Sequence, residues 1–136
     1  MNANDGELLV SIVGGIAHVT LNRPQARNAL TFGMYEELAK LCALAGTADD
    51  ADHIKVIVIA GAGNKAFAAG TDIGQFTAFD STEDGLRYEA RVEAVISQIE
   101  SCHVPVIAAL HGAITGGGLV IAAAAHVRIA SAAAVA

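Results

Sequence analysis

IKVIVIA, residues 54–60, is a nearly continuous apolar run, and the glycine-rich stretch GAGN follows it at residues 61–64. Such a run is typical of a β-strand that is covered on both faces, as in a parallel sheet flanked by helices. A second run of this kind, VPVIAAL, occupies residues 104–110. The two stretches predict an α/β layer structure.

The segments before residue 54 predict a β-hairpin followed by a helix. Residues 8–13 and 16–21 are apolar and rich in β-branched side chains, and Gly14-Gly15 between them is the two-residue connection of a hairpin. Within residues 34–45, Met34, Leu38, Leu41 and Leu44 recur at helical spacing, and the charged residues lie on the other positions. This pattern predicts an amphipathic helix.

The second half of the chain predicts two more helices and a further strand. Ser81, with an acidic residue three positions later, forms a variant capping box that opens a long helix ending at Glu100. A small-residue helix is expected over residues 119–125, and a strand begins at residues 127–130. The alternation of strands and helices predicts right-handed βαβ crossovers.

The bulk composition excludes several classes of function. The 136 residues are 54% hydrophobic, which provides enough material for one core. The formal net charge is −6 and the basic residues are scattered, so we expect no nucleic-acid partner. The two cysteines form no CxxC motif, and the N-terminal MNANDGE does not resemble a leader peptide. A cytoplasmic location is predicted.

One stretch would be long enough to cross a membrane. Residues 101–127 contain no Asp, Glu, Lys or Arg. The stretch is interrupted by His103, Pro105, His111 and three consecutive glycines, whereas a membrane span is continuous and predominantly apolar. We therefore predict a buried strand, a loop and a buried helix here, and no membrane association.

Two glycine-bearing turns are the candidate functional elements. AFAAGTDI at residues 66–73 and HGAITGGGL at residues 111–119 each join a buried strand to a helix. The first amides of a helix have no internal partner, and glycine lets a ligand approach the backbone closely. If both turns lie at one end of the sheet, their amides form an oxyanion hole. The alternative reading of each turn is a tight packing device or a flexible connection.

Four motifs, taken in order, resemble the crotonase (enoyl-CoA hydratase/isomerase) superfamily. They are LNRP with NAL at residues 21–30, KAFAAGTDI at 65–73, VPVIAA with the later glycines at 104–118, and RIAS at 128–131. The resemblance implies a crotonase-like (ClpP/crotonase) α/β spiral of βαβ units, incomplete at the C-terminus. It implies one acyl-CoA-binding core over residues 1–136 that lacks the C-terminal helical trimerisation region.

The resemblance also implies roles for individual residues. The backbone N–H groups of Thr71 and Gly117 match the two oxyanion donors of the family, which polarise the thioester carbonyl of an acyl-CoA. The same match implies substrate-binding positions at Arg23, Arg27, Ala66, Ala68, Gly70, Asp72, Gly116 and Val120. Coenzyme A enters as part of the substrate, so no separate cofactor is expected. The histidines lack ligand spacing, and no metal is predicted.

The sequence departs from the family pattern at the acid/base positions. The resemblance implies two catalytic glutamates in a hydratase of this family. The position of the first is Val120 here, which cannot transfer a proton, and the position of the second falls beyond Ala136. Asp72 is expected to cap the helix after the first turn. Glu89 is a weak candidate to replace the missing acid/base residue. Alternatively, Glu89 belongs to a solvated helix face. Ala125-His126 replaces the family's usual Cys-Asp.

These observations leave two functions open. The first is an enoyl-CoA hydratase or isomerase that stabilises an enolate through its oxyanion hole. The second is a non-catalytic crotonase-like CoA-binding protein, a pseudoenzyme, because Val120 stands at the catalytic position. A purely structural or membrane-associated apolar protein is a more distant rival. A homo-oligomer, trimer or hexamer, is expected because a half-length domain exposes apolar surface.

Overall fold

The computed structural model describes residues 6–72, 74 and 81–136. A five-stranded sheet in the order β1-β2-β3-β5-β7 forms one layer. Its only antiparallel pair is β1 with β2; β2, β3, β5 and β7 run parallel. The strands of this sheet are β1 (Leu8–Val13), β2 (Ile16–Leu21), β3 (Val56–Gly61), β5 (Val106–Leu110) and β7 (Val127–Ala130).

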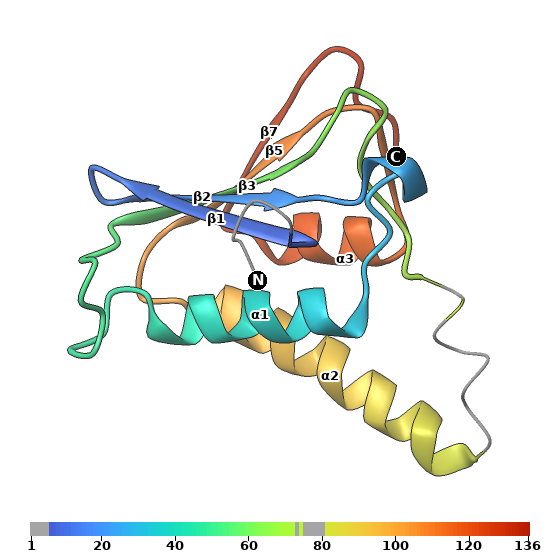
Figure 1. The fold of residues 1–136 in the computed structure, drawn as a ribbon, viewed down its shortest axis with the longest axis horizontal. Coiled ribbons are helices and arrows are strands. Elements are labelled where there is room, and N and C mark those ends of the chain that lie inside the picture. The colour runs from blue at the N-terminus through green and yellow to red at the C-terminus, as the bar shows by residue number, and fades with distance from the viewer. Residues whose placement is uncertain (1–5, 73, 75–80) are drawn as a thin grey trace.

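Three α-helices lie on one side of this sheet (Figure 1). They are α1 (Phe32–Leu44), α2 (Thr82–Glu100) and α3 (Gly117–Ala124), and a short 3-10 helix, η2 (Pro24–Ala26), precedes α1. Helices α1 and α2 pack against each other, and α3 sits between α2 and the sheet region. The core fills the space between the helices and the buried face of the sheet.

The predicted hairpin and the first long helix are confirmed. Gly14 and Gly15 have φ values of +59° and +81°, the left-handed conformation that a two-residue hairpin turn requires. Helix α1 begins at Phe32 because the Thr31 hydroxyl accepts a hydrogen bond from the Met34 N–H at 3.2 Å. Helix α2 begins after Ser81, whose hydroxyl accepts from the Asp84 N–H at 3.3 Å.

The expected cover on both faces of β3 is wrong for the chain described. Ile57 and Ile59 are fully buried on the helical side, whereas Val56 and Val58 on the other side are only half-buried. The reason is that all three α-helices lie on the same face (Figure 1). An apolar run shows that both faces avoid water, but it does not show which part of an assembly covers each face.

A second, two-stranded sheet was not predicted. It pairs β4 (Ala66–Ala69) in parallel with β6 (Ala113–Thr115), within the segments read as turns. Strands of three or four small residues have little β-propensity, so their sequence gives no strand signal. This small sheet contacts β3 of the larger one and holds the two glycine-bearing segments side by side.

The charge-free stretch of the sequence folds as β5, β6 and α3. Helix α3 begins at Gly117, two residues before the predicted start, because Gly116 takes the N-cap position with a φ of +53°. In the described part of the chain, no helix is long and apolar enough to cross a membrane.

Candidate functional site

The turn after β4 leaves the amide of Thr71 without an acceptor among the described residues. Thr71 forms a parallel bridge with Leu30, in which the Leu30 N–H donates to the Gly70 carbonyl at 2.9 Å and the Asp72 N–H donates to the Leu30 carbonyl at 2.8 Å. In a parallel bridge these bonds come from the two neighbours of the bridged residue, so its own N–H points to the opposite side. Within the residues described, the Thr71 N–H has no hydrogen-bond acceptor.

The amide of Gly117 also has no backbone acceptor in the part of the chain that the structure describes, because of its place in the chain. Gly117 is the first residue of α3, and the first N–H groups of a helix have no carbonyl four residues earlier within the helix. The positive end of the helix dipole lies at the same point. The Gly117 N–H is therefore a donor in a locally positive environment.

Pairing of β4 with β6 brings the two turns into contact. The Gly70 N–H donates to the Thr115 carbonyl at 2.8 Å, which joins the carboxyl ends of the two strands. A Cβ added at Gly116 would lie 3.0 Å from the Gly70 Cα, and one at Gly117 would lie 2.8 Å from Thr71 Oγ1. A side chain at Gly116 would press on the backbone of Gly70, and one at Gly117 would collide with neighbouring side chains.

The structure thus brings the two segments that carry the predicted donors, Thr71 and Gly117, side by side. Two N–H groups that donate to the same carbonyl oxygen stabilise the negative charge that this oxygen gains. Their assignment as an oxyanion hole stays a prediction at this point, and the geometry described above is its support.

Two tyrosine hydroxyls border this site, and sequence reasoning missed them. The Tyr35 hydroxyl from α1 lies 2.8 Å from Thr71 Oγ1, and the Tyr88 hydroxyl from α2 donates to the same oxygen at 3.2 Å. Burial of the ring raises the pKa of Tyr35 to about 12, so this phenol stays protonated at neutral pH. No local pattern marks either tyrosine, because the contacts join residues that are 36 and 17 positions apart.

Arg23, which was predicted to contact the substrate, makes a hydrogen bond and an ion pair within the protein. Its guanidinium donates to the Ala29 carbonyl at 2.6 Å and forms an ion pair with Asp72 at 3.3 Å. The other carboxylate oxygen of Asp72 accepts from the Gly74 N–H at 3.0 Å. Arg23 therefore fixes the turn after β4 against the loop before α1. The helix expected after Asp72, together with Ile73, lies outside the described residues.

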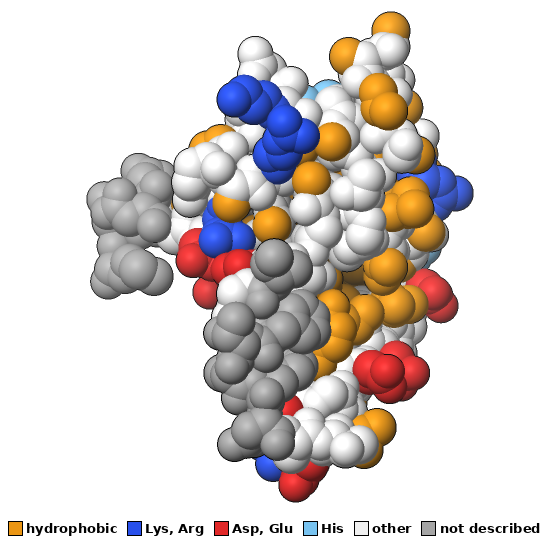
Figure 2. Space-filling view, turned by 90° about the vertical axis from the view of Figure 1, so that its right-hand side faces the viewer, with side chains coloured by type: hydrophobic (Ala, Val, Ile, Leu, Met, Phe, Trp, Pro, Cys, Tyr) orange, Lys and Arg blue, Asp and Glu red, His pale blue; other side chains and the backbone are white. Residues whose placement is uncertain are grey.

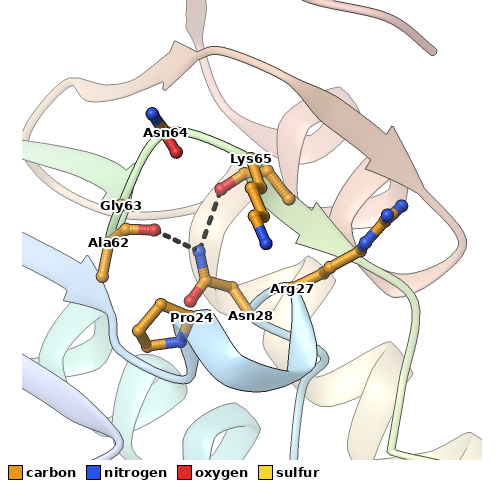
Figure 3. A pocket seen from close by; sticks show the side chains of 8 residues that line it. Pro24, Arg27, Asn28, Ala62, Gly63, Asn64 and Lys65 are labelled. Carbon is orange, nitrogen blue, oxygen red and sulfur yellow. Dashed lines mark hydrogen bonds between the residues drawn. The ribbon is translucent and has the colours of Figure 1, made fainter.

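A pocket next to the turn carries two exposed basic side chains, Arg27 and Lys65. Its volume is about 200 Å³, and it is lined by Pro24, Arg27, Asn28, Ala62, Gly63, Asn64, Lys65 and Ala66. Figure 3 shows the Lys65 side chain pointing over Asn28, while the Arg27 side chain extends outward from the same rim. The sequence predicted Arg27 as a binding residue but not Lys65, which stands at the start of the KAFAAGTDI motif.

Asn28 holds this pocket in shape. Its side chain is fully buried, and its amide nitrogen donates to the carbonyls of Ala62 and Ala66, each at 2.9 Å (Figure 3). Its side-chain oxygen accepts from the Arg23 N–H at 2.9 Å. Asn28 has a φ of +57°, a conformation that asparagine tolerates better than most residues.

The remaining predicted positions lie along the same two segments. Ala66 and Ala68 are buried within β4, and a Cβ on Gly118 would collide with the Ala68 carbonyl. Val120 is half-buried in the first turn of α3. Glu89 is exposed on α2, which favours its reading as part of a solvated face. The structure shows these positions but does not test their roles.

The histidines that we predicted to be structural include two with backbone contacts. His126 Nδ1 accepts from the Val106 N–H at 2.9 Å, so its hydrogen is on Nε2, which donates to the Glu100 carbonyl at 3.1 Å. The ring therefore joins the end of α2 to the start of β5. His111 Nε2 lies 2.9 Å from the Gly63 carbonyl. In the described ranges, no group of three His, Cys, Asp or Glu is placed to hold a metal ion.

Comparison with known proteins points to one family. A family model described as enoyl-CoA hydratase/isomerase matches residues 11–136. The chain is 35% identical over 118 residues to a short-chain-enoyl-CoA hydratase of Clostridium acetobutylicum, and the match covers 87% of this chain and 44% of that protein. It is 34% identical over 127 residues to the peroxisomal Delta(3,5)-Delta(2,4)-dienoyl-CoA isomerase of Arabidopsis thaliana. That match covers 85% of this chain and 44% of the isomerase.

Solved structures give the same result for the fold. The crystal structure of an enoyl-CoA hydratase from Mycobacterium smegmatis superposes with a TM-score of 0.81 at 34% sequence identity. The superposition covers 93% of this chain and 48% of that one. The chain thus spans less than half the length of each of these relatives.

Proposed function

Because the chain belongs to the enoyl-CoA hydratase/isomerase family and has its crotonase fold, we propose that it binds an acyl-CoA thioester and polarises the thioester carbonyl. The observation that carries this proposal is the close approach of the two segments that bear the amides of Thr71 and Gly117: a Cβ at Gly117 would lie 2.8 Å from Thr71 Oγ1. A thioester oxygen that accepts from both gains stabilisation as its charge grows toward an enolate. Each such donor contributes about 3 kcal/mol to a developing oxyanion.

The pocket lined by Arg27 and Lys65 supplies the second part of the proposal. Both side chains are exposed cations on one rim, and phosphate groups are attracted to such positions. We propose that they hold the phosphates of the CoA nucleotide. The pantetheine arm would then follow β4 past Ala66, Ala68 and Gly70 toward the amide pair and Gly116. Arg23 and Asp72 keep the turn in place through their ion pair.

A comparison of two ligands tests the amide pair directly. Acetyl-CoA carries the thioester oxygen, whereas ethyl-CoA, a thioether with the same CoA portion, does not. We expect isothermal titration calorimetry to show binding of both ligands, with the thioester bound about tenfold more tightly, because one or two hydrogen bonds to the carbonyl are lost in the thioether. Equal affinities would refute the oxyanion site, and no binding of either would refute CoA recognition.

The reaction is proposed as hydration or isomerisation of an enoyl-CoA. The alternative, a non-catalytic CoA-binding protein, is favoured by one observation: Val120 on α3 stands where the family resemblance places a catalytic glutamate. An assay of the ultraviolet absorbance of crotonyl-CoA decides between them. Loss of the enoyl absorbance at a rate above that of buffer supports the enzyme, whereas tight binding without turnover supports the pseudoenzyme.

We also propose that the chain forms a homo-oligomer, either a trimer or a hexamer, and acts in the cytoplasm. Figure 2 shows hydrophobic side chains along the right-hand part of one face of the molecule. Among the large apolar side chains that are exposed are Leu119, Val127, Ile129 and Val135. The cytoplasmic location is consistent with Cys42 and Cys102, which are both free thiols.

A further inference from the structure

The two cysteines of the chain lie in segments that the fold brings together. Cys42 is in the last turn of α1, and Cys102 follows the end of α2 in the connection to β5. Helices α1 and α2 pack against each other (Figure 1). Both cysteine side chains contact the same hydrophobic core, in which Cys42 is 1% exposed and Cys102 is half-buried.

The chain beside each cysteine is in direct contact with the other segment. Gly46 lies one helical turn after Cys42, and a Cβ added there would lie 3.2 Å from His103 Cβ and 2.9 Å from Val104 Cγ1. His103 and Val104 follow Cys102 directly. The side chain of Cys102 also forms a hydrogen bond with that of Cys42. A disulfide needs two cysteine side chains that face each other, and this pair meets that condition.

The two thiols differ in their access to an oxidant. Burial raises the pKa of the Cys42 thiol to about 12, and the neighbouring Cys102 acts in the same direction. Cys42 therefore stays protonated, whereas peroxides react with thiolates that they can reach. Cys102 is the more accessible of the two, so an oxidant meets Cys102 first and finds Cys42 directly behind it.

We propose that Cys42 and Cys102 form a reversible redox site, in which a peroxide converts the two thiols into a disulfide within one chain. The Cys102 thiolate attacks a peroxide oxygen, the O–O bond breaks, and Cys102 becomes a sulfenic acid. The Cys42 sulfur then attacks the Cys102 sulfur. The S–S bond forms, the S–O bond breaks, and the departing hydroxyl group takes the Cys42 proton and leaves as water.

The electrons and atoms balance over the two steps. The two thiols lose two electrons and two hydrogens, and hydrogen peroxide is reduced to two molecules of water. A dithiol reductant reverses the change by thiol–disulfide exchange, as is typical of transient disulfides in reducing compartments. The bond would join the end of α1 covalently to the connection that leads into β5.

Mass spectrometry tests for the bond directly. The reduced protein is treated with hydrogen peroxide, catalase removes the excess, and the remaining thiols are alkylated after unfolding in guanidinium chloride. We expect both cysteines to escape alkylation, and trypsin to release peptides 41–55 and 92–128 as one linked species, lighter by two hydrogens than the separate peptides together. Dithiothreitol should restore alkylation at both positions. Unchanged alkylation after peroxide, or a Cys102–Cys102 bond between two chains, would overturn the proposal.

Two substitutions separate the roles of the thiols. In Cys42→Ala the sulfenic acid of Cys102 has no resolving thiol, so dimedone should capture at least about tenfold more of it than in wild type. In Cys102→Ala the buried Cys42 should stay reduced and remain open to alkylation after unfolding. Equal dimedone capture in wild type and Cys42→Ala would contradict a resolving role for Cys42. The wild-type measurement needs no variant and decides the proposal even where a core substitution weakens the fold.

Urea denaturation shows whether the bond fits the native fold. A disulfide between distant positions restricts the unfolded chain, so the oxidised wild type should have a urea midpoint higher by about 1 M than the reduced protein. The same peroxide treatment should leave the midpoint of Cys102→Ala unchanged, which controls for oxidation at other residues. A midpoint that does not rise in oxidised wild type would show that the fold does not accommodate the disulfide, and the proposal would be wrong.

Discussion

Gly117 shows how far the candidate site depends on a single residue. A Cβ at this position would lie 2.8 Å from Thr71 Oγ1 and 3.2 Å from Leu30 Cδ1, and it would overlap the Tyr35 hydroxyl. The sequence identified Gly117 through a motif, whereas the structure gives the physical reason for glycine. Only glycine leaves room here for three neighbouring side chains, those of Tyr35, Thr71 and Leu30.

Gly117→Ala is therefore predicted to abolish the preference for a thioester over its thioether. The added methyl group must displace Tyr35 or Thr71, and overpacking of this kind costs about 1–3 kcal/mol of stability. Calorimetric titration with acetyl-CoA and ethyl-CoA measures the preference, and urea denaturation measures the stability.

Gly85→Ala is the matched control for this substitution. Gly85 lies within α2, and a Cβ there would have no neighbour within 4 Å. Replacement of a helical glycine by alanine is expected to stabilise the protein by about 0.5–1 kcal/mol, with no change in ligand preference. An unchanged preference in Gly117→Ala would show that the backbone at residue 117 does not contact the thioester.

At the scale of single elements, the loop between α1 and β3 depends on one carboxylate. Asp50 is buried, and its oxygens accept from the N–H groups of Gly46 at 3.0 Å, Ile54 at 2.8 Å and Asp52 at 3.1 Å. The hydrogen bond from Gly46 is the largest cause of a pKa below the ordinary value of the carboxyl, and the bonds from Ile54 and Asp52 act in the same direction. Asp50 thus sets where β3 begins after α1 ends.

Acid should weaken the fold through this group. Because the folded state lowers the pKa of Asp50, the unfolded state binds a proton more readily. The stabilisation is present above the ordinary Asp pKa of about 3.9 and is lost as the pH falls through the lower folded value. We expect the urea midpoint of wild type to decrease when the pH is lowered below about 4. The urea midpoint of Asp50→Asn should be lower than that of wild type at pH 7 but should change less when the pH is lowered.

Asp49→Asn provides the control, since Asp49 is the exposed neighbour of Asp50. Its pH profile should follow that of wild type. If Asp50→Asn retains the full acid sensitivity of wild type, another carboxylate is responsible for it.

At the scale of the whole molecule, the helices of the described residues lie on one face of the larger sheet and leave its other face uncovered (Figure 1). Register places Ile129 of β7 beside Ala109 of β5 and Ala60 of β3, on the side away from the buried residues Ile59 and Ala108. Ile129 is 61% exposed. Apolar side chains on such a surface favour association with another protein surface, and a second copy of this chain is the partner that we propose.

Ile129→Lys is predicted to shift the protein toward the monomer in sedimentation velocity experiments at micromolar concentration. A charged side chain placed in an apolar interface must lose its hydration without gaining a partner. Leu86→Lys is the matched control, because Leu86 is 60% exposed but lies on α2, away from this sheet. A wild-type monomer, or an equal effect of both substitutions, would contradict association through β7.

The candidate site was predictable in part. The motifs identified Thr71 and Gly117, and the start of α3 at Gly117 strengthens the case for an unpaired amide. Sequence reasoning missed Tyr35, Tyr88 and Lys65, because a tyrosine in a helix and a lysine before a strand have no distinctive local pattern. The ion pair of Arg23 with Asp72 was also not predicted, and the substrate-binding role of Arg23 stays a prediction.

The sequence by itself determined the helices, the strands of the larger sheet, the hairpin turn and the family. These follow from the spacing of apolar residues, from caps and glycines, and from ordered motifs, all of which act over a few neighbouring positions. Only the tertiary structure decided the β4–β6 pairing, the contacts of the Tyr35 and Tyr88 hydroxyls with Thr71 and the uncovered face of the sheet. These depend on which distant segments the folded chain brings within hydrogen-bond distance, and local periodicity carries no information about that path.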